Sequence, residues 1–233
     1  MRFGGLLKNS FIDYPGKISS VLFLAGCNFT CPYCHNPDLA RGKAEQHDFL
    51  HEKKVFEFLK NRLGLIEGIV ITGGEPTLCP DLLRICAKIR KLGYPVKLDT
   101  NGSRPEIIKK LIDSTLIDYI AMDIKTDPDN YSPLIWKKAE PEKIFASAKM
   151  IMNSGFDYEF RTTCLKPFID KKIIEKISGI ITGATLYALQ RCNDKRVLDR
   201  DFFKNNDRLI KEDELQKLKI IASEQVRECI VRG

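Results

Sequence analysis

The sequence lacks any long hydrophobic run, and no basic segment followed by an apolar one stands at its N-terminus. A membrane-spanning helix needs about 20 apolar residues, and a secretory signal needs the second pattern. We therefore expect no membrane partner and a cytoplasmic location. A long basic run and an interleaved aromatic platform are also missing, which argues against nucleic-acid binding. The net charge of +7, from 38 basic and 31 acidic residues, is consistent with solubility or with attraction to an acidic protein partner.

Cysteine is sparse, with eight irregularly spaced residues among 233, which argues against a disulfide scaffold. Three of them, Cys27, Cys31 and Cys34, nevertheless share one short loop after an apolar run. Thiolates so placed can converge on one inorganic centre, and a four-iron cluster normally takes four. Either a distant cysteine completes the set, or one iron stays open for another molecule. A zinc site is disfavoured, because it usually needs two ligand pairs and the chain has no second Cys-x-x-Cys.

Apolar runs alternate along the chain with segments of helical periodicity. The expected strands are 19–24, 68–72, 94–99, 117–124, 157–164 and 184–190, and the expected helices are 51–62, 80–92, 104–113, 142–153, 170–178 and 211–227. This alternation predicts an α/β fold with a parallel sheet covered by helices. We expect one domain over 1–233, with a core of about 17–190 and a C-terminal helical extension of about 204–230. Segment 1–17 carries a turn at Asp13–Gly16, 42–48 is polar, and the proline-rich segment 126–141 is predicted to be a long loop or lid.

Unusual residues follow each predicted strand at the end where parallel sheets bind ligands. In chain order these are the cysteine loop, Gly73-Gly74-Glu75-Pro76, Asp99-Thr100-Asn101-Gly102, then Asp123 and Lys125, then Arg161, and lastly Gln190. Because carboxyl ends of parallel strands share one edge of a sheet, these residues predict a single binding site.

Each group has two interpretations. The paired glycines could let the backbone approach a ligand or could only form a tight turn. Asp99, Thr100 and Asp123 could hold a cation or a ribose, or could cap the following helices. Lys125 and Arg161 could bind a carboxylate or could pair with neighbouring acidic side chains.

The remaining cysteines and histidines are weaker signals. Cys86 lies on the apolar side of a predicted helix and is expected in the core. Cys79, Cys164 and Cys192 share no metal-ligand spacing, and Cys229 is expected in a terminal tail. His35 is expected to make a local hydrogen bond, whereas His47 and His51 are expected to be solvated.

The spacing Cys27-x-x-x-Cys31-x-Tyr33-Cys34, followed by Gly73-Gly74-Glu75-Pro76, resembles the radical S-adenosylmethionine enzymes. The segments Ser10–Lys17 and Cys34–Pro37 are similar to those of glycyl-radical enzyme activating enzymes, in particular the longer form that activates anaerobic ribonucleoside-triphosphate reductase. The resemblance extends from Met1 to about Gln190.

This resemblance implies a partial (β/α)6 barrel with a [4Fe-4S] cluster on Cys27, Cys31 and Cys34. S-adenosylmethionine would chelate the fourth iron. Reduction of the cluster would then give methionine and a 5′-deoxyadenosyl radical that takes a hydrogen atom from a glycine of the partner. The resemblance implies two partners. One is a glycyl-radical enzyme, namely anaerobic ribonucleotide reductase, and the other is an electron donor such as flavodoxin or ferredoxin.

The resemblance also implies roles for individual residues. The residues implied to contact the cofactor are Tyr33, Gly73, Gly74, Glu75, Asp99, Lys125, Arg161 and Gln190. Asp99, Thr100 and Asp123 match a set that holds a cation, which could be monovalent. Segment 126–141 and the C-terminal helix are the expected contact surfaces for the partner.

Two departures from the family pattern indicate which branch of the activating enzymes the chain resembles. No histidine follows His51, which favours the reductase-activating branch over the formate-lyase branch, whose members carry a late histidine. No cysteine-rich insertion follows Gly42, which argues against activases with additional clusters. The alternatives are an activase of another glycyl-radical enzyme such as pyruvate formate-lyase, a radical enzyme with a different substrate, and a structural metal-binding interaction module that is not an enzyme.

Overall fold

The computed structural model describes residues 2–41, 50–132, 135–136, 138, 140–204 and 207–233. The predicted polar stretch 42–48, with His47, lies outside these residues, as do parts of segment 126–141. Contacts divide the chain into two compact units. The first unit comprises Met1–Asn28, Asn36–Thr100 and Glu106–Ile120, and the second comprises Phe29–His35, Asn101–Pro105 and Ala121–Gly233. The division passes through the strand β7 (Tyr119–Asp123) and through the cysteine loop.

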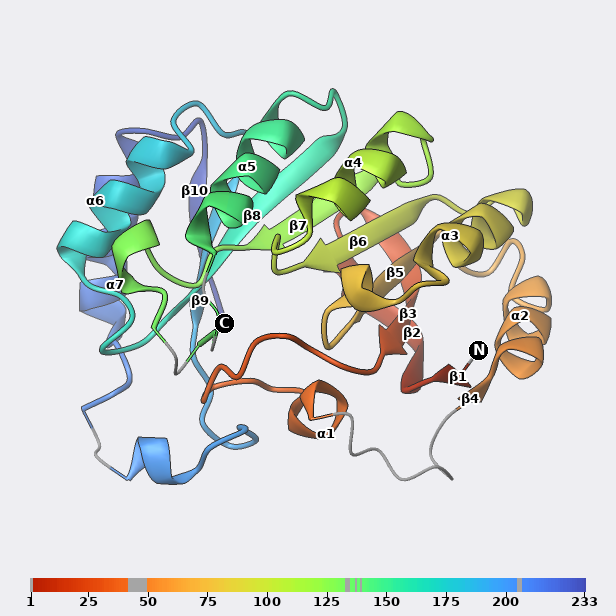
Figure 1. The fold of residues 1–233 in the computed structure, drawn as a ribbon, viewed down its shortest axis with the longest axis horizontal. Coiled ribbons are helices and arrows are strands. Elements are labelled where there is room, and N and C mark those ends of the chain that lie inside the picture. The colour runs from red at the N-terminus through yellow and green to blue at the C-terminus, as the bar shows by residue number, and fades with distance from the viewer. Residues whose placement is uncertain (1, 42–49, 133–134, 137, 139, 205–206) are drawn as a thin grey trace. The chain divides into compact units, whose positions relative to one another are not determined.

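The first unit alternates strands and helices as predicted (Figure 1). Its strands are β1 (Arg2–Phe3), β2 (Gly5–Tyr14), β3 (Lys17–Leu24), β4 (Leu50–His51), β5 (Gly68–Gly73) and β6 (Val96–Thr100). Its helices are α1 (Pro37–Ala40), α2 (Glu52–Lys60), the 3-10 helix η1 (Pro76–Leu78), α3 (Leu82–Lys91) and α4 (Pro105–Asp113), of which Pro105 belongs to the second unit. The strand order is β2-β3-β5-β6, and β3, β5 and β6 are parallel.

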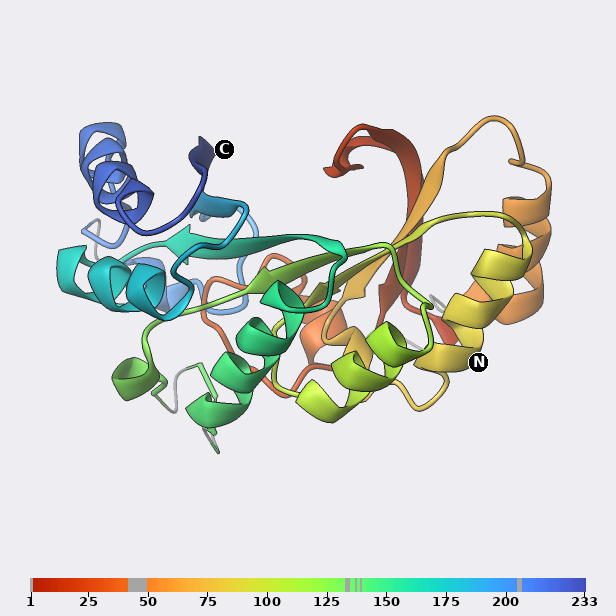
Figure 2. The same cartoon turned by 90° about the horizontal axis from the view of Figure 1, so that it is seen from above.

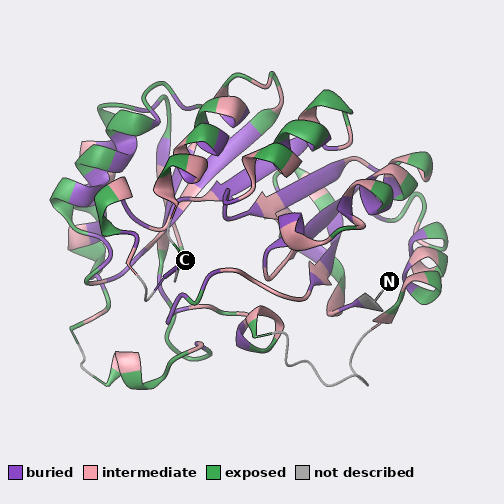
Figure 3. Cartoon of the chain, in the orientation of Figure 1, coloured by how far each residue is buried: buried purple, intermediate pink, exposed green. Residues whose placement is uncertain are grey.

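Burial explains these elements. Leu22, Ile71 and Leu98 are fully buried in β3, β5 and β6. The first four residues of β5 are all buried, which is typical of a parallel strand covered on both faces. Helices α2, α3 and α4 lie along one side of these strands (Figure 2), and their inward-facing residues are buried (Figure 3). The predicted helix and strand positions of this unit are therefore correct to within a few residues.

The strand β2 was not predicted. It pairs with β3 in the antiparallel direction, and the predicted turn at Pro15 and Gly16 joins the two strands. Irregular register accompanies this pairing, and large apolar residues such as Phe11 and Ile12 are exposed on β2. Because the segment lacks a clean alternation of buried and exposed residues, its sequence does not indicate a strand. The sheet is therefore mostly, not entirely, parallel.

The second unit contains β8 (Asp157–Cys164), β9 (Tyr187–Arg191) and β10 (Cys229–Arg232), which are parallel and adjacent in that order. Its helices are η2 (Pro128–Asn130), α5 (Pro141–Met152), α6 (Lys171–Ile180), η3 (Asp201–Phe203) and α7 (Glu212–Ser223). The prediction that Cys229 lies in a terminal tail is wrong, because Cys229 begins β10 and is buried. A strand of four residues is too short to show a period, so the C-terminal extension was expected to be helical throughout.

Among the described residues, no helix is long and apolar enough to cross a membrane. The division into two units falls within a strand and not at a linker, and the single domain over 1–233 stays a prediction.

Candidate functional site

Close backbone packing in the first unit positions the start of the cysteine loop. The amide of Gly74 donates to the Leu24 carbonyl, and the amide of Glu75 donates to the Gly26 carbonyl, each at 2.8 Å. A Cβ atom on Gly74 would lie 2.1 Å from the Gly26 oxygen, and one on Gly73, whose φ is +123°, would lie 2.3 Å from the Leu24 oxygen. Both glycines are therefore required by the approach of the chain to the residues just before Cys27. The two glycines thus allow a close approach of backbone to backbone, which neither interpretation from the sequence had named.

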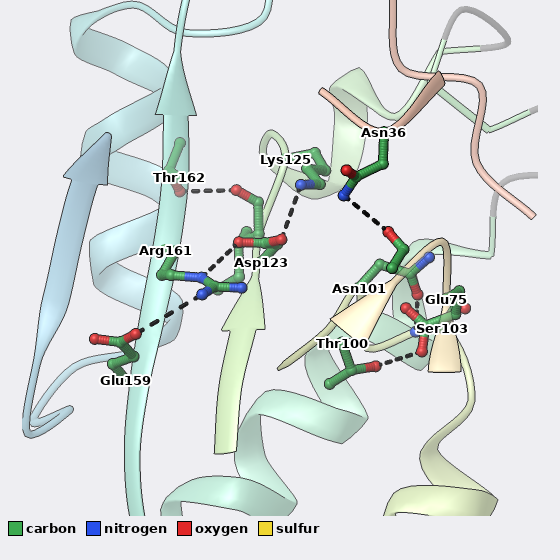
Figure 4. A network of polar contacts seen from close by, with 12 residues as sticks. Asn36, Glu75, Thr100, Asn101, Ser103, Asp123, Lys125, Glu159, Arg161 and Thr162 are labelled. Atoms are coloured by element: carbon green, nitrogen blue, oxygen red, sulfur yellow. Dashed lines mark hydrogen bonds and ion pairs between the residues drawn. The ribbon is translucent and has the colours of Figure 1, made fainter. Parts of the chain in front are cut away.

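The carboxylate of Glu75 is buried and joins the ends of two strands (Figure 4). Its Oε1 atom accepts hydrogen bonds from the Thr77 amide at 3.0 Å, the Thr77 hydroxyl at 2.5 Å and the Thr100 hydroxyl at 2.7 Å. The bond from the Thr77 amide caps η1, and the bond from Thr100 connects the segment after β5 to the end of β6. The Thr100 hydroxyl therefore donates a hydrogen bond to Glu75, a contact that spacing along the chain did not predict.

Asn36 holds the chain where it leaves the cysteine loop. Its side-chain Nδ2 atom donates to the Gly73 carbonyl at 3.2 Å (Figure 4). The sequence carried a signal for this residue, since Asn36 stands between Cys34 and Pro37 in one of the segments of the family resemblance, but no role was assigned to it.

Asp99 has a buried cation beside it that the sequence analysis missed. Lys97 is 1% exposed and forms an ion pair with Asp99, two residues further along β6. Its Nζ atom also lies 5.8 Å from the centre of the Tyr119 ring. A lysine within a predicted buried strand was the available signal, because lysine is almost never fully buried unless it is paired.

In the second unit, Cys31 and Tyr33 are buried and Cys34 is half-buried. The Cys34 amide donates to the Cys31 carbonyl at 3.0 Å, which makes a tight turn. Burial raises the pKa of the Cys31 thiol to about 11, against the opposing effect of the Lys125 ammonium. All eight cysteines of the chain lie among the described residues, and none forms a disulfide.

Strands β7 and β8 bring charged side chains together (Figure 4). Asp123 pairs with the Lys125 ammonium at 3.1 Å through Oδ2, and accepts a hydrogen bond from Arg161 Nε at 2.9 Å through Oδ1. Glu159 lies 3.9 Å from the Arg161 guanidinium and 2.7 Å from that of Arg232. We call these five residues the charge cluster. Its three cations exceed its two carboxylates by one charge, which suits an anionic group.

Opposing effects act on the Asp123 carboxyl. Burial alone would raise its pKa, but Arg161 and Lys125 outweigh burial and lower the pKa to about 2. Lys125 Nζ also lies 6.0 Å from the centre of the Tyr33 ring, which places the cluster beside the cysteine loop within this unit.

Other parts of the second unit enclose the cysteine loop. The Phe29 ring lies 4.9 Å from the Trp136 ring, and the Thr30 amide donates to the Ile135 carbonyl at 2.7 Å. Ile135 and Trp136 belong to segment 126–141, the predicted lid and partner surface, yet both side chains are buried. Where it is described, the apolar side of this segment therefore faces the loop.

The segment after β9 contacts the other end of the loop. A ring nitrogen of His35 is 2.8 Å from the Asn193 carbonyl, and the Asp199 amide donates to the Pro32 carbonyl at 3.0 Å. The prediction that His35 makes a hydrogen bond is correct, but its partner is 158 residues away, so the bond is not local.

The other cysteines are mostly buried thiols. Cys86 is fully buried in α3, as predicted, and burial raises its pKa to about 12. Burial likewise raises the pKa of Cys164 to about 12 and those of Cys192 and Cys229 to about 11. These four thiols are therefore protonated at neutral pH.

The predicted cation ligands divide between the units, with Asp99 and Thr100 in the first and Asp123 in the second. Gln190 is half-buried in β9, in register with Thr163 of β8. In the described part of the chain, no group of three or more Cys, His, Asp or Glu side chains is arranged to hold a metal ion. Cys27 belongs to the first unit and Cys31 and Cys34 to the second, so a cluster assignment rests on the cysteine motif and on the chemistry of the three thiols.

Comparison with known proteins decides the family. Residues 21–177, which include the cysteine loop, the Gly-Gly-Glu-Pro segment and the charges of β7, match the Radical SAM superfamily. The chain belongs to the radical SAM superfamily. It is therefore an enzyme of the radical SAM type, and membership implies a [4Fe-4S] cluster and S-adenosylmethionine as cofactors.

Two relatives match over most of the chain. A protein of Methanocaldococcus jannaschii named "Putative glycyl-radical enzyme activating enzyme" is 36% identical, and the match covers 98% of this chain and 94% of that protein. The pyruvate formate-lyase-activating enzyme of Clostridium pasteurianum is 31% identical over 73% of this chain and 71% of its own length.

A solved structure shares the fold. SuiB of Streptococcus suis, bound to S-adenosylmethionine, superposes with a TM-score of 0.64 at 12% identity. The match covers 91% of this chain and 52% of SuiB, so the chain spans about half of that protein. The predicted fold class, an α/β partial (β/α)6 barrel of the radical SAM type, is thereby confirmed, with the antiparallel β2 as an addition.

Proposed function

We propose that this protein activates a glycyl-radical enzyme, and that the partner is anaerobic ribonucleoside-triphosphate reductase. The observation that carries the activase assignment is the similarity to the Methanocaldococcus relative, which is 36% identical over 98% of this chain. The charge cluster beside Cys31 and Tyr33 suits an anionic group of the cofactor. The reductase is favoured because no histidine follows His51.

The residues fit the cofactors that family membership implies. Three cysteines outside any disulfide stand on one loop, and soft thiolates suit an iron–sulfur cluster. Cys27, Cys31 and Cys34 would hold a [4Fe-4S] cluster with one iron left for S-adenosylmethionine. That molecule would be contacted by Tyr33, Gly73, Gly74, Glu75, Asp99, Lys125, Arg161 and Gln190. The cluster would supply the electron for reductive cleavage of S-adenosylmethionine, which is the chemistry needed to remove a hydrogen atom from a glycine of the partner.

Side chains of the chain itself prepare this site. The Lys125 ammonium would pair with the methionine carboxylate, and Asp123 holds Lys125 in place through its ion pair. Arg161 in turn holds Asp123, so the orientation of Lys125 does not depend on the ligand alone. Phe29 and Trp136 pack against each other and keep water from the adjoining part of the loop.

Anaerobic reconstitution with iron and sulfide tests the cluster. We expect about four irons per chain for the wild type. Cys31→Ala should lose the cluster absorption and the reductive cleavage of S-adenosylmethionine, and Cys79→Ala, which removes a cysteine outside the loop, should keep both. Bound zinc without sulfide in the wild type would contradict the assignment and would support a structural metal-binding module.

Incubation with candidate partners tests the partner. Anaerobic ribonucleoside-triphosphate reductase should develop a glycyl-radical signal in electron paramagnetic resonance, with reduced flavodoxin or ferredoxin as electron donor. The relative from Clostridium supports pyruvate formate-lyase as the second candidate. A signal in the lyase alone would assign the protein to that branch, and a signal in neither would favour another substrate.

The cytoplasmic location stays a prediction. The predicted monovalent cation at Asp99, Thr100 and Asp123 is left out of the proposed site, because cationic side chains already pair with both carboxylates.

A further inference from the structure

Both carboxylates of the predicted cation set have partners from the chain itself. Asp99 pairs with the Lys97 ammonium in the first unit, and Asp123 pairs with Lys125 and Arg161 in the second. A cation site relies on oxygen ligands whose negative charge is left for the ion. The chain therefore departs from the pattern that the family resemblance implies, and it does so independently in the two units.

The position of Lys97 is specific. Alternate residues of a strand share a face, so Lys97 and Asp99 lie on the same face of β6, whereas Val96 and Leu98 point to the other and are fully buried. Lys97 is 1% exposed and Asp99 is 13% exposed, so the pair is largely removed from water.

The surroundings of the Lys97 ammonium suit a fixed cation. The Tyr119 ring lies 5.8 Å from its Nζ atom, and the face of an aromatic ring attracts a cation. A buried ammonium is stable only when it is paired. Lys97 thus brings one positive charge to Asp99, which is the charge that a bound K⁺ or Na⁺ would bring.

We propose that Lys97 takes the place of a monovalent cation at Asp99, so that this protein binds S-adenosylmethionine without K⁺ or Na⁺. This inference rests on the proposed function for its ligand. Lys97 is a positioning residue, which acts by neutralising and orienting Asp99.

The test is the affinity of the anaerobically reconstituted protein for S-adenosylmethionine, measured by calorimetry. The salts are KCl, NaCl and tetramethylammonium chloride at equal ionic strength, since tetramethylammonium is too large for a small oxygen-lined site. The wild type should bind with the same Kd in all three. A Kd that rises about tenfold or more without K⁺ and Na⁺, the size expected for a lost charge contact, would overturn the inference.

Variants locate the effect. Lys97→Met should weaken binding in tetramethylammonium by about tenfold, and K⁺ should restore part of the loss, because Asp99 then lacks its ammonium. Lys97→Arg keeps the charge and should remain insensitive to the salt. Lys88→Met removes a lysine that pairs with Glu52 in the same unit, and this control should also show no preference among the salts. Equal binding of Lys97→Met in all salts would contradict the role of Lys97.

Thermal unfolding gives a readout that does not need S-adenosylmethionine. The Tm of Lys97→Met should rise when K⁺ replaces tetramethylammonium, whereas the wild-type Tm should not. Should no salt support binding of S-adenosylmethionine, the proposed function fails. A wild-type Tm that rises specifically with K⁺ would contradict the inference about Lys97 but not the proposed function. The two results therefore distinguish failure of the inference from failure of the proposed function.

Discussion

The end of β5 in the first unit and the end of β7 in the second are held by different interactions. In the first unit, Gly73 and Gly74 pack against backbone, and Glu75 accepts hydrogen bonds from threonine hydroxyls. In the second unit, ion pairs connect Asp123, Lys125 and Arg161. Packing fixes where the cysteine loop begins, whereas the ion pairs supply a net charge next to it. Substitutions at Gly73, Gly74 and Glu75 should therefore change mainly geometry, and those at Asp123, Lys125 and Arg161 should change mainly electrostatics.

The largest effect is expected in the second unit. Asp123→Ala leaves Lys125 and Arg161 as buried cations without their shared carboxylate, which should lower the free energy of unfolding by about 3–5 kcal/mol. Urea denaturation of the cluster-free protein measures it. Asp113→Ala, which breaks an exposed pair with Lys109, is the matched control and should cost less than about 1 kcal/mol. Similar losses of unfolding free energy in both variants would show that the charge cluster stabilises the fold no more than an exposed ion pair does.

Gly74→Ala tests the close packing of the first unit. The added Cβ would lie 2.1 Å from the Gly26 oxygen, so the backbone must shift, and we expect a loss of about 1–3 kcal/mol. Gly179→Ala, in the helix α6 with open space around it, should instead gain about 0.5–1 kcal/mol. The change in stability of each variant is measured from its denaturation midpoint. An unchanged midpoint for Gly74→Ala would mean that the contact with Gly26 relaxes without cost.

Thr100→Val tests the connection between β5 and β6 by removing one donor to Glu75. Because Glu75 is buried, the expected loss is about 1–3 kcal/mol, toward the lower end since Thr77 still donates. Thr182→Val, at an exposed position, should change stability by less than about 0.5 kcal/mol. Equal effects would argue that the Thr100 bond does not support the strand ends.

The smallest effect concerns a surface group of the first unit, Glu52. Hydrogen bonds from Arg84 and Lys88 lower the pKa of its carboxyl to about 2, from an ordinary value of 4.5. A lowered folded-state pKa stabilises the protein above pH 4.5, and this contribution is lost as the pH falls through 2. Glu52→Gln should therefore be less stable than the wild type at neutral pH, by at most about 1 kcal/mol. The difference should shrink toward pH 2 in denaturation series, and a difference that persists there would exclude the charge as its cause.

Most of the fold could be predicted because helices and buried strands leave local patterns. The strands that were missed, β1, β2, β4 and β10, lack such a pattern, since β2 exposes large apolar residues and the other three have only two to four residues. Among site residues, Asp123, Lys125 and Arg161 were expected at strand ends, and the structure brings them together. Lys97 and Asn36 were missed because their partners, not their spacing, show what they do.

By itself the sequence determined the cysteine spacing, the order of strands and helices, and the positions at which polar residues follow strands. These are local properties, set by periodicity and by neighbours along the chain. Only the tertiary structure decided that Asp99 is paired with Lys97, that His35 meets Asn193, and that the glycines face Gly26 and Leu24. Burial and pairing depend on which residues come together in space, so the same aspartate could be a cation ligand or one half of an ion pair until its neighbours were known.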